Sequence, residues 1–336
     1  MRFFVISIKK YFFTMLFLLF TITLIIFSAS NLDAARNGLT LWANSVVPTL
    51  LPFFIATELL CKTNFIQILG KYLNKFIKPI FNLPGESVIA IIMGIISGYP
   101  VGAKVVCNLY EKKICSKAEA ERLIAFTNNS GPIFILGSVG VSLLGNAKIG
   151  QLLLISHILS SLIVGFIFRF WKQNQVNLTF RNYNSENTEL VRVSNLGEIL
   201  GDAIKKSIFT VLSIGGFIVL FSVIISILTS SQILVIIANS LKFFGIPYEF
   251  SLGFLTGIIE LTNGLQATSL FYTSMPTSCI LLCSFLLGFG GLSVLLQVFS
   301  IISKSKISIK SYFYGKLLHG TISVILIFLL LNFVVV

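Results

Sequence analysis

Long runs of apolar residues, separated by short polar stretches, dominate the pattern of this sequence. Five runs approach or exceed the roughly 20 residues that a helix needs to cross the core of a bilayer; they are 11–30, 39–60, 149–171, 207–229 and 312–336. Apolar and polar residues do not alternate in these runs with the period of two that a transmembrane β-barrel requires. Because a backbone in lipid must satisfy its own hydrogen bonds, the runs predict membrane-crossing α-helices.

Two further apolar segments, 86–110 and 249–272, are interrupted at their centres. The first carries the run Ser97-Gly98-Tyr99-Pro100-Val101-Gly102, and the second carries Glu260-Leu261-Thr262-Asn263-Gly264. Glycine and proline break helices, and each arm of about 11 residues gives about 16 Å of helix, half of a bilayer. We therefore expect two re-entrant helical hairpins that return to the side from which they start.

The chain also resembles itself. When Gly38 is placed on Gly201, Pro84 meets Pro247, Glu86 meets Glu249, and 94–96 (Gly-Ile-Ile) meets 257–259. After a one-residue deletion, His157 meets His319, and these are the two histidines of the chain. Matches at proline, glutamate and histidine are informative in so apolar a sequence. They predict four segments, which are an N-terminal transmembrane helix at 1–37, repeat one at 38–171, a polar linker at 172–200 and repeat two at 201–336.

The distribution of Lys and Arg predicts the topology. If both hairpins are re-entrant, each repeat crosses the membrane three times, so the two repeats have inverted topologies. With a cytoplasmic N-terminus, 20 of the 25 Lys and Arg residues then lie on the inner side, Arg122 among them, and three (Arg36, Lys148 and Lys242) lie outside. The positive-inside rule requires this bias. The expected fold is an all-α polytopic membrane protein with seven crossings, an inner linker and an exported C-terminus.

Two other segments complete the expected architecture. Segment 123–144 is apolar but contains Thr127-Asn128-Asn129-Ser130-Gly131-Pro132, which predicts a discontinuous crossing helix, and the glycine-rich stretch 288–293 is its counterpart in repeat two. Segment 64–81 gathers its apolar residues mainly on one helical face, as interfacial helices do. The first 30 residues resemble a signal peptide, but their apolar core of about 17 residues is longer than that of a cleaved signal, so we expect a retained helix.

Composition excludes several classes of function. Only 11% of the residues are charged, against about 25% in soluble proteins. The net charge of +13 reflects the inner loops, so we expect no nucleic-acid partner. The five cysteines form no CxxC pair or zinc-type cluster, which indicates buried structural residues. Motifs for ATP binding or metal-dependent hydrolysis are missing from the sequence, so we expect no enzyme activity, cofactor or metal.

The candidate site is the set of polar residues inside otherwise apolar segments. A charged residue near the bilayer centre costs on the order of 2.5–3.5 kcal/mol, so Glu260 is expected either to face a cavity or to tie its hairpin together. Lys104 either binds an anion or extends to the inner surface, and His157 and His319 are expected to make structural hydrogen bonds. The expected substrate-binding residues are Ser97, Tyr99, Lys104, Asn128, Asn129, Ser130, Glu260, Thr262, Asn263 and Gln266. Inverted repeats with broken helices and polar tips at mid-depth are typical of secondary transporters.

Six segments of the sequence resemble a known family. They are 38–42, 47–54, 94–104 (with SGYPVGAK), 127–137 (with NNSGP), 215–221 and 257–264. In these segments the chain resembles the sporulation integral membrane protein YlbJ family, also called stage V sporulation protein V. The segment 215–221 is also similar to a wider set of nucleoside-recognition gate membrane proteins.

The resemblance implies a role in endospore formation, a place in the outer forespore membrane and transport of dipicolinic acid. It also implies kinship with concentrative nucleoside transporters. The residues themselves predict a secondary transporter of a small polar or anionic solute in a lipid bilayer, with a proton or sodium as the possible coupling ion. A nucleoside-type solute and a non-transporting membrane scaffold remain as alternatives.

Overall fold

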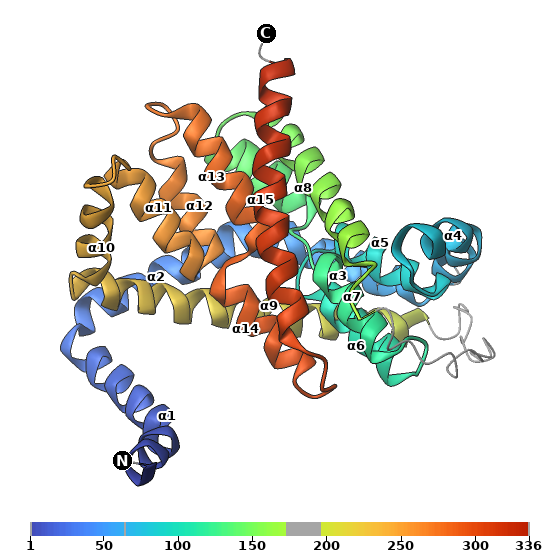
Figure 1. Cartoon of the computed structure of the whole chain (residues 1–336), viewed down its shortest axis with the longest axis horizontal. Coiled ribbons are helices and arrows are strands. Elements are labelled where there is room, and N and C mark those ends of the chain that lie inside the picture. The colour runs from blue at the N-terminus through green and yellow to red at the C-terminus, as the bar shows by residue number, and fades with distance from the viewer. Residues whose placement is uncertain (1, 64, 173–195, 335–336) are drawn as a thin grey trace.

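The computed structural model describes residues 2–63, 65–172 and 196–334, and every regular element in these ranges is helical (Figure 1). The first half contains α1 (Arg2–Ile26), α2 (Ser28–Leu41), the π-helical turn η1 (Trp42–Val46), α3 (Val47–Cys61), α4 (Phe65–Phe81), η2 (Gly85–Ser87), α5 (Val88–Ile96), α6 (Val101–Glu111), α7 (Lys117–Thr127), η3 (Phe134–Leu143) and α8 (Ala147–Phe168). The second half contains α9 (Leu196–Ser230), α10 (Ile233–Lys242), α11 (Tyr248–Ile259), α12 (Leu261–Ser269), α13 (Pro276–Phe289), α14 (Gly291–Ile302) and α15 (Ile309–Val334).

The order of elements recurs in the two halves. Each half begins with a long helical stretch, continues with a shorter helix, a hairpin and a broken helix, and ends with a long helix. The two starting stretches, α2–α3 and α9, pack side by side, and so do the two final helices, α8 and α15. The predicted inverted-repeat fold is confirmed, whereas the predicted segment boundaries remain predictions.

Both hairpins are present. The arms α5 and α6 pack against each other, as do α11 and α12. The first hairpin turns at 97–100, as predicted. The prediction for the second is too wide, because only Glu260 interrupts the helix and 261–264 belong to α12. A single residue suffices there because the Glu260 carboxylate itself caps the next helix.

Both discontinuous helices are also confirmed. Residues 128–131 lie outside the helices between α7 and η3. In the second half the break is at Gly290 and Gly291, with φ of 85° and 76°. Glycine adopts this left-handed region without a steric penalty, which explains the glycine-rich sequence at this break.

The first helix differs from the expectation. It ends at Ile26 rather than near residue 30, and the chain then bends by 98° into the next helix. Residues 28–37 are therefore the beginning of a second long helical stretch. Asn31 is buried at this bend and donates its amide to the Thr23 carbonyl, which also accepts from the Phe27 N–H.

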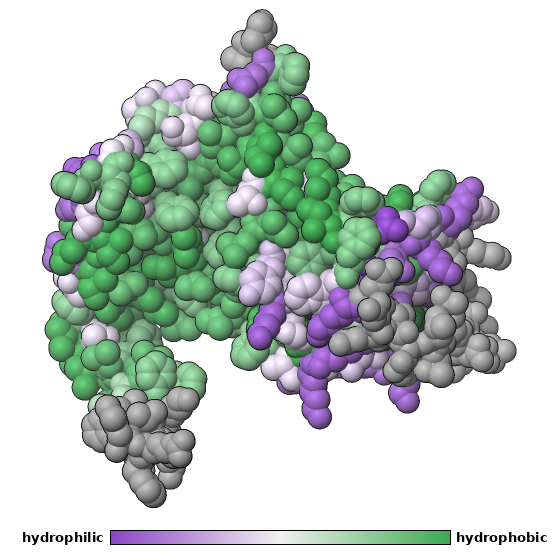
Figure 2. Space-filling model, viewed as in Figure 1, coloured by the Kyte–Doolittle hydropathy of each residue, from purple (hydrophilic) through white to green (hydrophobic). Residues whose placement is uncertain are grey.

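Four described spans are each long and apolar enough to cross a membrane, namely 147–168, 196–230, 276–302 and 309–333, where 276–302 counts α13 and α14 together across their break. Two bent pairs raise the number to six if each pair is one span. Figure 2 shows that apolar residues cover most of the visible face and that hydrophilic residues gather beside α4, α6 and α7. The remaining predicted crossings (the first helix, 39–60 and 123–144), their orientation and the depth of α4 stay predictions.

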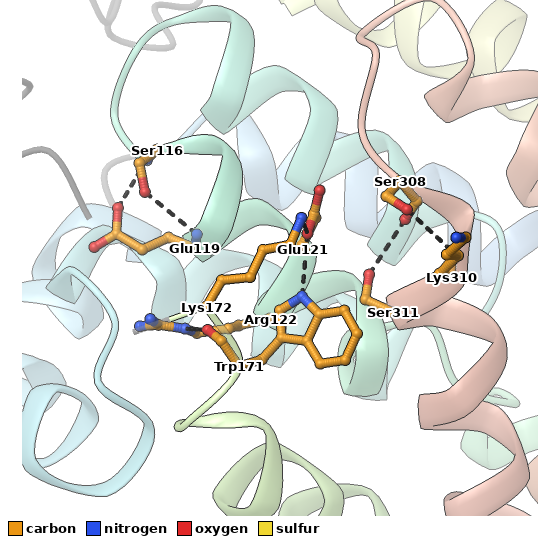
Figure 3. A network of polar contacts seen from close by, with 9 residues as sticks. All are labelled: Ser116, Glu119, Glu121, Arg122, Trp171, Lys172, Ser308, Lys310 and Ser311. Carbon is orange, nitrogen blue, oxygen red and sulfur yellow. Dashed lines mark hydrogen bonds and ion pairs between the residues drawn. The ribbon is translucent and has the colours of Figure 1, made fainter. Parts of the chain in front are cut away.

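A network of polar contacts lies on the hydrophilic side of repeat one, around α7 (Figure 3). Glu121 is fully buried in α7, and its carboxylate binds Lys172 at 2.8 Å and the Trp171 indole at 3.1 Å. Arg122 donates to the carbonyl oxygens of Trp171 and Asn82. The assignment of Arg122 to an inner loop is therefore wrong, because this side chain is buried in a helix. Most of the predicted linker, 173–195, lies outside the described residues.

Candidate functional site

The tips of the two hairpins meet at a pocket. Its space free of protein atoms is about 310 Å³ when the open solvent at its mouth is counted, and it lies between the hairpins, the broken helices, the η1–α3 stretch and α9. Its walls are mainly apolar, and its polar lining residues are Tyr99, Glu260, Thr262 and Gln297. Aliphatic and aromatic walls with a few polar groups are typical of small-molecule sites.

The tip of hairpin one is fixed to the break in the neighbouring helix. The Tyr99 N–H donates to the Asn129 carbonyl at 2.7 Å, and the Ala103 N–H donates to the Asn128 side chain at 3.4 Å. Gly94 makes this approach possible, because a Cβ there would overlap the carbonyl group of Thr127. The backbone of Tyr99 is therefore fixed at the pocket by contacts that do not involve its side chain.

The broken segment 128–131 is buried and makes specific hydrogen bonds. The Asn128 amide donates to the Tyr312 hydroxyl at 3.1 Å, and the Asn129 amide donates to the Phe126 carbonyl at 2.9 Å. The Ser130 N–H donates to Nε2 of His157, and the Ser130 hydroxyl donates to the Leu287 carbonyl. The segment thus connects hairpin one with α8, α13 and α15.

Glu260 both lines the pocket and ties hairpin two together. One oxygen of its carboxylate accepts from the Asn263 N–H at 2.7 Å and from the Asn263 side-chain amide at 2.8 Å. The same amide donates to the Ser222 hydroxyl on α9 at 2.8 Å. The two functions considered for Glu260 from the sequence are therefore compatible, because the capping contacts leave the residue at the pocket wall.

The predicted site residues fall into three groups. Tyr99, Glu260 and Thr262 line the pocket. Ser97, Asn128, Asn129 and Ser130 are buried around it, and Asn263 is half-buried beside Glu260. Lys104 and Gln266 are exposed, and the Lys104 ammonium donates to the Thr210 hydroxyl on α9 at 2.7 Å. The structure does not bring these last two to the pocket, because both lie beyond the tips, on the second arms of the hairpins.

Two polar residues near the site were not identified from the sequence. Gln297 lines the pocket from α14, and its Oε1 has no partner among the described residues. Lys316 is buried in α15 and donates to the Asn128 carbonyl at 3.0 Å. A lone lysine within an apolar run was the available signal for Lys316, but the sequence drew attention to Lys104 instead.

The two histidines lie together where the last helices of the halves cross. Their ring centroids are 4.4 Å apart, and His319 Nε2 is 2.9 Å from the His157 carbonyl. His319 Nδ1 is 3.1 Å from the Lys316 ammonium nitrogen. The His319 ring therefore holds α15 against α8, whereas the His157 ring accepts from the Ser130 N–H of the broken segment.

The N-termini of several helices near the pocket favour particular chemical groups in a solute. The helices α6, α12, η3 and α14 all begin after the hairpin tips or helix breaks that surround it. Helix N-termini carry partial positive charge and free N–H groups, which favour anions and carbonyl oxygens. The Glu260 carboxylate and the Gln297 amide oxygen accept hydrogen bonds instead. Among the described residues, no group of three His, Cys, Asp or Glu side chains could hold a metal ion.

Comparison with solved structures shows the same fold in a transporter. A structure described as CNTnw in an inward-facing substrate-bound state aligns with a TM-score of 0.50 and 14% sequence identity, covering 92% of this chain and 86% of that one. At this identity the likeness concerns the fold alone. It identifies a concentrative-nucleoside-transporter-like arrangement of helices.

Comparison of sequences gives the family. Residues 43–147, which include hairpin one and the first helix break, match the family described as Gate: Nucleoside recognition. The chain is 36% identical over 330 residues to the sporulation integral membrane protein YlbJ of Bacillus subtilis (strain 168), covering 94% of this chain and 81% of that protein. This chain therefore belongs to the sporulation integral membrane protein YlbJ family.

Proposed function

We propose that this protein is a secondary transporter that moves dipicolinate across the outer forespore membrane during sporulation. The observation that carries the transport function is the pocket between two hairpin tips, lined by Tyr99, Glu260, Thr262 and Gln297. In secondary transporters, broken helices place their N-termini at such a site near the middle of the membrane. The family resemblance supports the choice of solute and membrane.

Dipicolinate is chemically compatible with most of this lining. Its flat ring suits walls such as Phe134, Ile214 and Ile218. Its carboxylates can accept hydrogen bonds from the Tyr99 and Thr262 hydroxyls, the Gln297 amide and the N–H groups at the helix starts. The Glu260 carboxylate repels a dianion, so the carboxylates of the solute must lie on the side of hairpin one.

A nucleoside-type solute is the second candidate, and one observation favours it. Glu260 and the unpartnered Oε1 of Gln297 are hydrogen-bond acceptors in the pocket wall. A neutral solute that carries hydroxyl or amino groups would satisfy both, whereas dipicolinate has no donor to offer at neutral pH.

Exchange across liposomes containing the purified full chain tests the two candidates. Liposomes preloaded with unlabelled solute are diluted into labelled dipicolinate or a labelled nucleoside, and empty liposomes serve as the control. We expect exchange of dipicolinate above the control. Exchange of the nucleoside alone would replace the proposed solute, and exchange of neither would favour the scaffold alternative.

A further inference from the structure

Lys316 lies in a buried polar cluster next to the broken helix of repeat one. Its side chain is 2% exposed. The ammonium nitrogen lies 3.0 Å from the Asn128 carbonyl oxygen and 3.1 Å from His319 Nδ1. The cluster thus joins α15 to the break in repeat one at 128–131, where the Asn128 carbonyl lies outside the regular helices.

No carboxylate neutralises this lysine in the described part of the chain. The ion pairs there join Arg36 to Asp33 and Lys172 to Glu121. A buried cation without a counter-ion is costly, and such groups lose their charge or acquire a partner. Lys316 is therefore placed to exchange a proton when its surroundings change.

The hydrogen-bond pattern indicates which form the described conformation accommodates. His319 Nε2 faces the His157 carbonyl, which can only accept, so Nε2 carries the proton and Nδ1 is free to accept from Lys316. The two acceptors around Lys316 match the two N–H bonds of a neutral amine. The third N–H of an ammonium group finds no acceptor among the described residues, which favours the neutral form here.

In secondary transporters, backbone carbonyl groups at the unwound part of a helix coordinate the coupling cations. Here the nitrogen of Lys316 occupies such a position on the Asn128 carbonyl. We propose that Lys316, together with His319, is the coupling-ion site of this protein and that the ion is a proton. The proposal rests on the proposed transport function. The proton adds to the lone pair of the lysine nitrogen and leaves from it, and no other bond changes.

The groups around Lys316 support this assignment. His319 and Tyr312 lie on its own helix, and His157 faces it from α8. On α7, Glu121 and Arg122 are engaged with Lys172, Trp171 and Asn82. On α13, Ser284 shares a hydrogen bond with Ser323 of α15 and does not titrate. The titratable groups of α13 are the buried Cys279 and Cys283 thiols, and the Glu121 carboxylate of α7 is already paired with Lys172.

A short path links this site to the pocket. Lys316 binds the Asn128 carbonyl, and the adjacent Asn129 carbonyl accepts from the Tyr99 N–H at the pocket wall. A protonated Lys316 also attracts an anionic solute through this low-dielectric region. Proton and anion therefore favour each other's binding, which is the reciprocity that coupled transport requires.

Imposed gradients test the nature of the ion in liposomes that contain the full chain. With equal sodium on both sides, a pH gradient should drive accumulation of labelled dipicolinate above its equilibrium level. With equal pH on both sides, a sodium gradient should drive none. Accumulation driven by sodium alone would overturn the proposal.

Substitution of the lysine tests the residue. Lys316→Met keeps the length of the side chain and removes the titrating group, so pH-driven accumulation should fall at least about tenfold, while exchange of labelled solute continues. Lys148→Met, at an exposed lysine near the start of α8, is the matched control and should stay within about twofold of the wild type. Retained pH-driven accumulation in Lys316→Met would refute the role of Lys316.

Two further measurements apply if Lys316→Met does not fold or if the wild type transports neither solute. If Lys316→Met does not yield folded protein, Lys316→Arg keeps a cation that does not release its proton, and it should also lose accumulation but keep exchange. If the wild type exchanges neither dipicolinate nor nucleosides, the proposed function fails. The ion assignment is then judged from thermal unfolding of the purified chain, where equal midpoints in sodium chloride and choline chloride are expected, and a higher midpoint in sodium would overturn it.

Discussion

The loss of transport caused by removing the Tyr99 hydroxyl indicates whether this hydroxyl contacts a charged or a neutral group of the solute. Tyr99 lines the pocket, and its backbone N–H is fixed to the Asn129 carbonyl at 2.7 Å. The change Tyr99→Phe therefore deletes one donor and leaves the backbone bond of the hairpin tip in place. The free energy of unfolding should change by no more than about 1 kcal/mol.

The size of the transport defect depends on the group that the hydroxyl contacts. A hydrogen bond to a carboxylate contributes about 1.5–3 kcal/mol, and a bond to a neutral group contributes about 0.5–1.5 kcal/mol. At 1.36 kcal/mol for each tenfold change, these values correspond to about 13- to 160-fold and about 2- to 13-fold losses of transport efficiency. For dipicolinate we expect a loss in the larger range.

The assay is the initial rate of labelled solute uptake into liposomes over a range of solute concentrations. Tyr110→Phe is the matched control, because Tyr110 is half-buried in α6 and does not line the pocket. A defect below about twofold in Tyr99→Phe, equal to that of the control, would show that the hydroxyl does not contact the solute. The pocket assignment would then be wrong for hairpin one.

Three other substitutions and one fusion test the remaining inferences. Glu260→Gln should lower uptake of a nucleoside-type solute at least tenfold, in the range of about 1.5–3 kcal/mol for a charged acceptor, with the protein still inserted. The same change should not lower uptake of dipicolinate through lost binding, because it removes a charge that repels the dianion. Ser222→Ala, which removes only the bond from Asn263, should keep uptake within about twofold, and equal defects in the two variants would leave Glu260 as a tie alone. If Lys104 only binds Thr210, Lys104→Met should leave dipicolinate uptake within about twofold of the wild type. A selective loss of dianion uptake would instead place Lys104 in the site. Gly94→Ala should lower the midpoint of thermal unfolding or abolish folding, because a Cβ there meets the Thr127 carbonyl group and overpacking costs about 1–3 kcal/mol or more. Gly137→Ala, with open space around its Cβ, should be tolerated, and a Gly94→Ala variant as stable as Gly137→Ala would contradict the packing. A reporter fused after Val336 should be active only when exported, and activity in the cytoplasm alone would reverse the predicted topology.

The sequence alone determined the class of protein and the positions of its chain breaks. Apolar runs long enough to cross a bilayer require helices, because lipid offers the backbone no hydrogen-bond partners. Ser97 to Pro100, Gly290 and the 128–131 stretch break those helices for local reasons that the chain carries in glycine, proline and asparagine. The equivalence of His157 and His319 was visible as a repeat, and the structure places the two rings 4.4 Å apart.

Only the tertiary structure decided which side of each helix faces the interior. Lys104 and Lys316 both stand in apolar segments, but Lys104 is exposed beside α9 whereas Lys316 is buried against the Asn128 carbonyl. Arg122 was assigned to a loop because of its charge, although it is buried in α7 and donates to the carbonyl oxygens of Trp171, in the turn after α8, and Asn82. The hydropathy of a residue depends on its own side chain, but its burial depends on the helices that pack around it, and these come from distant parts of the chain.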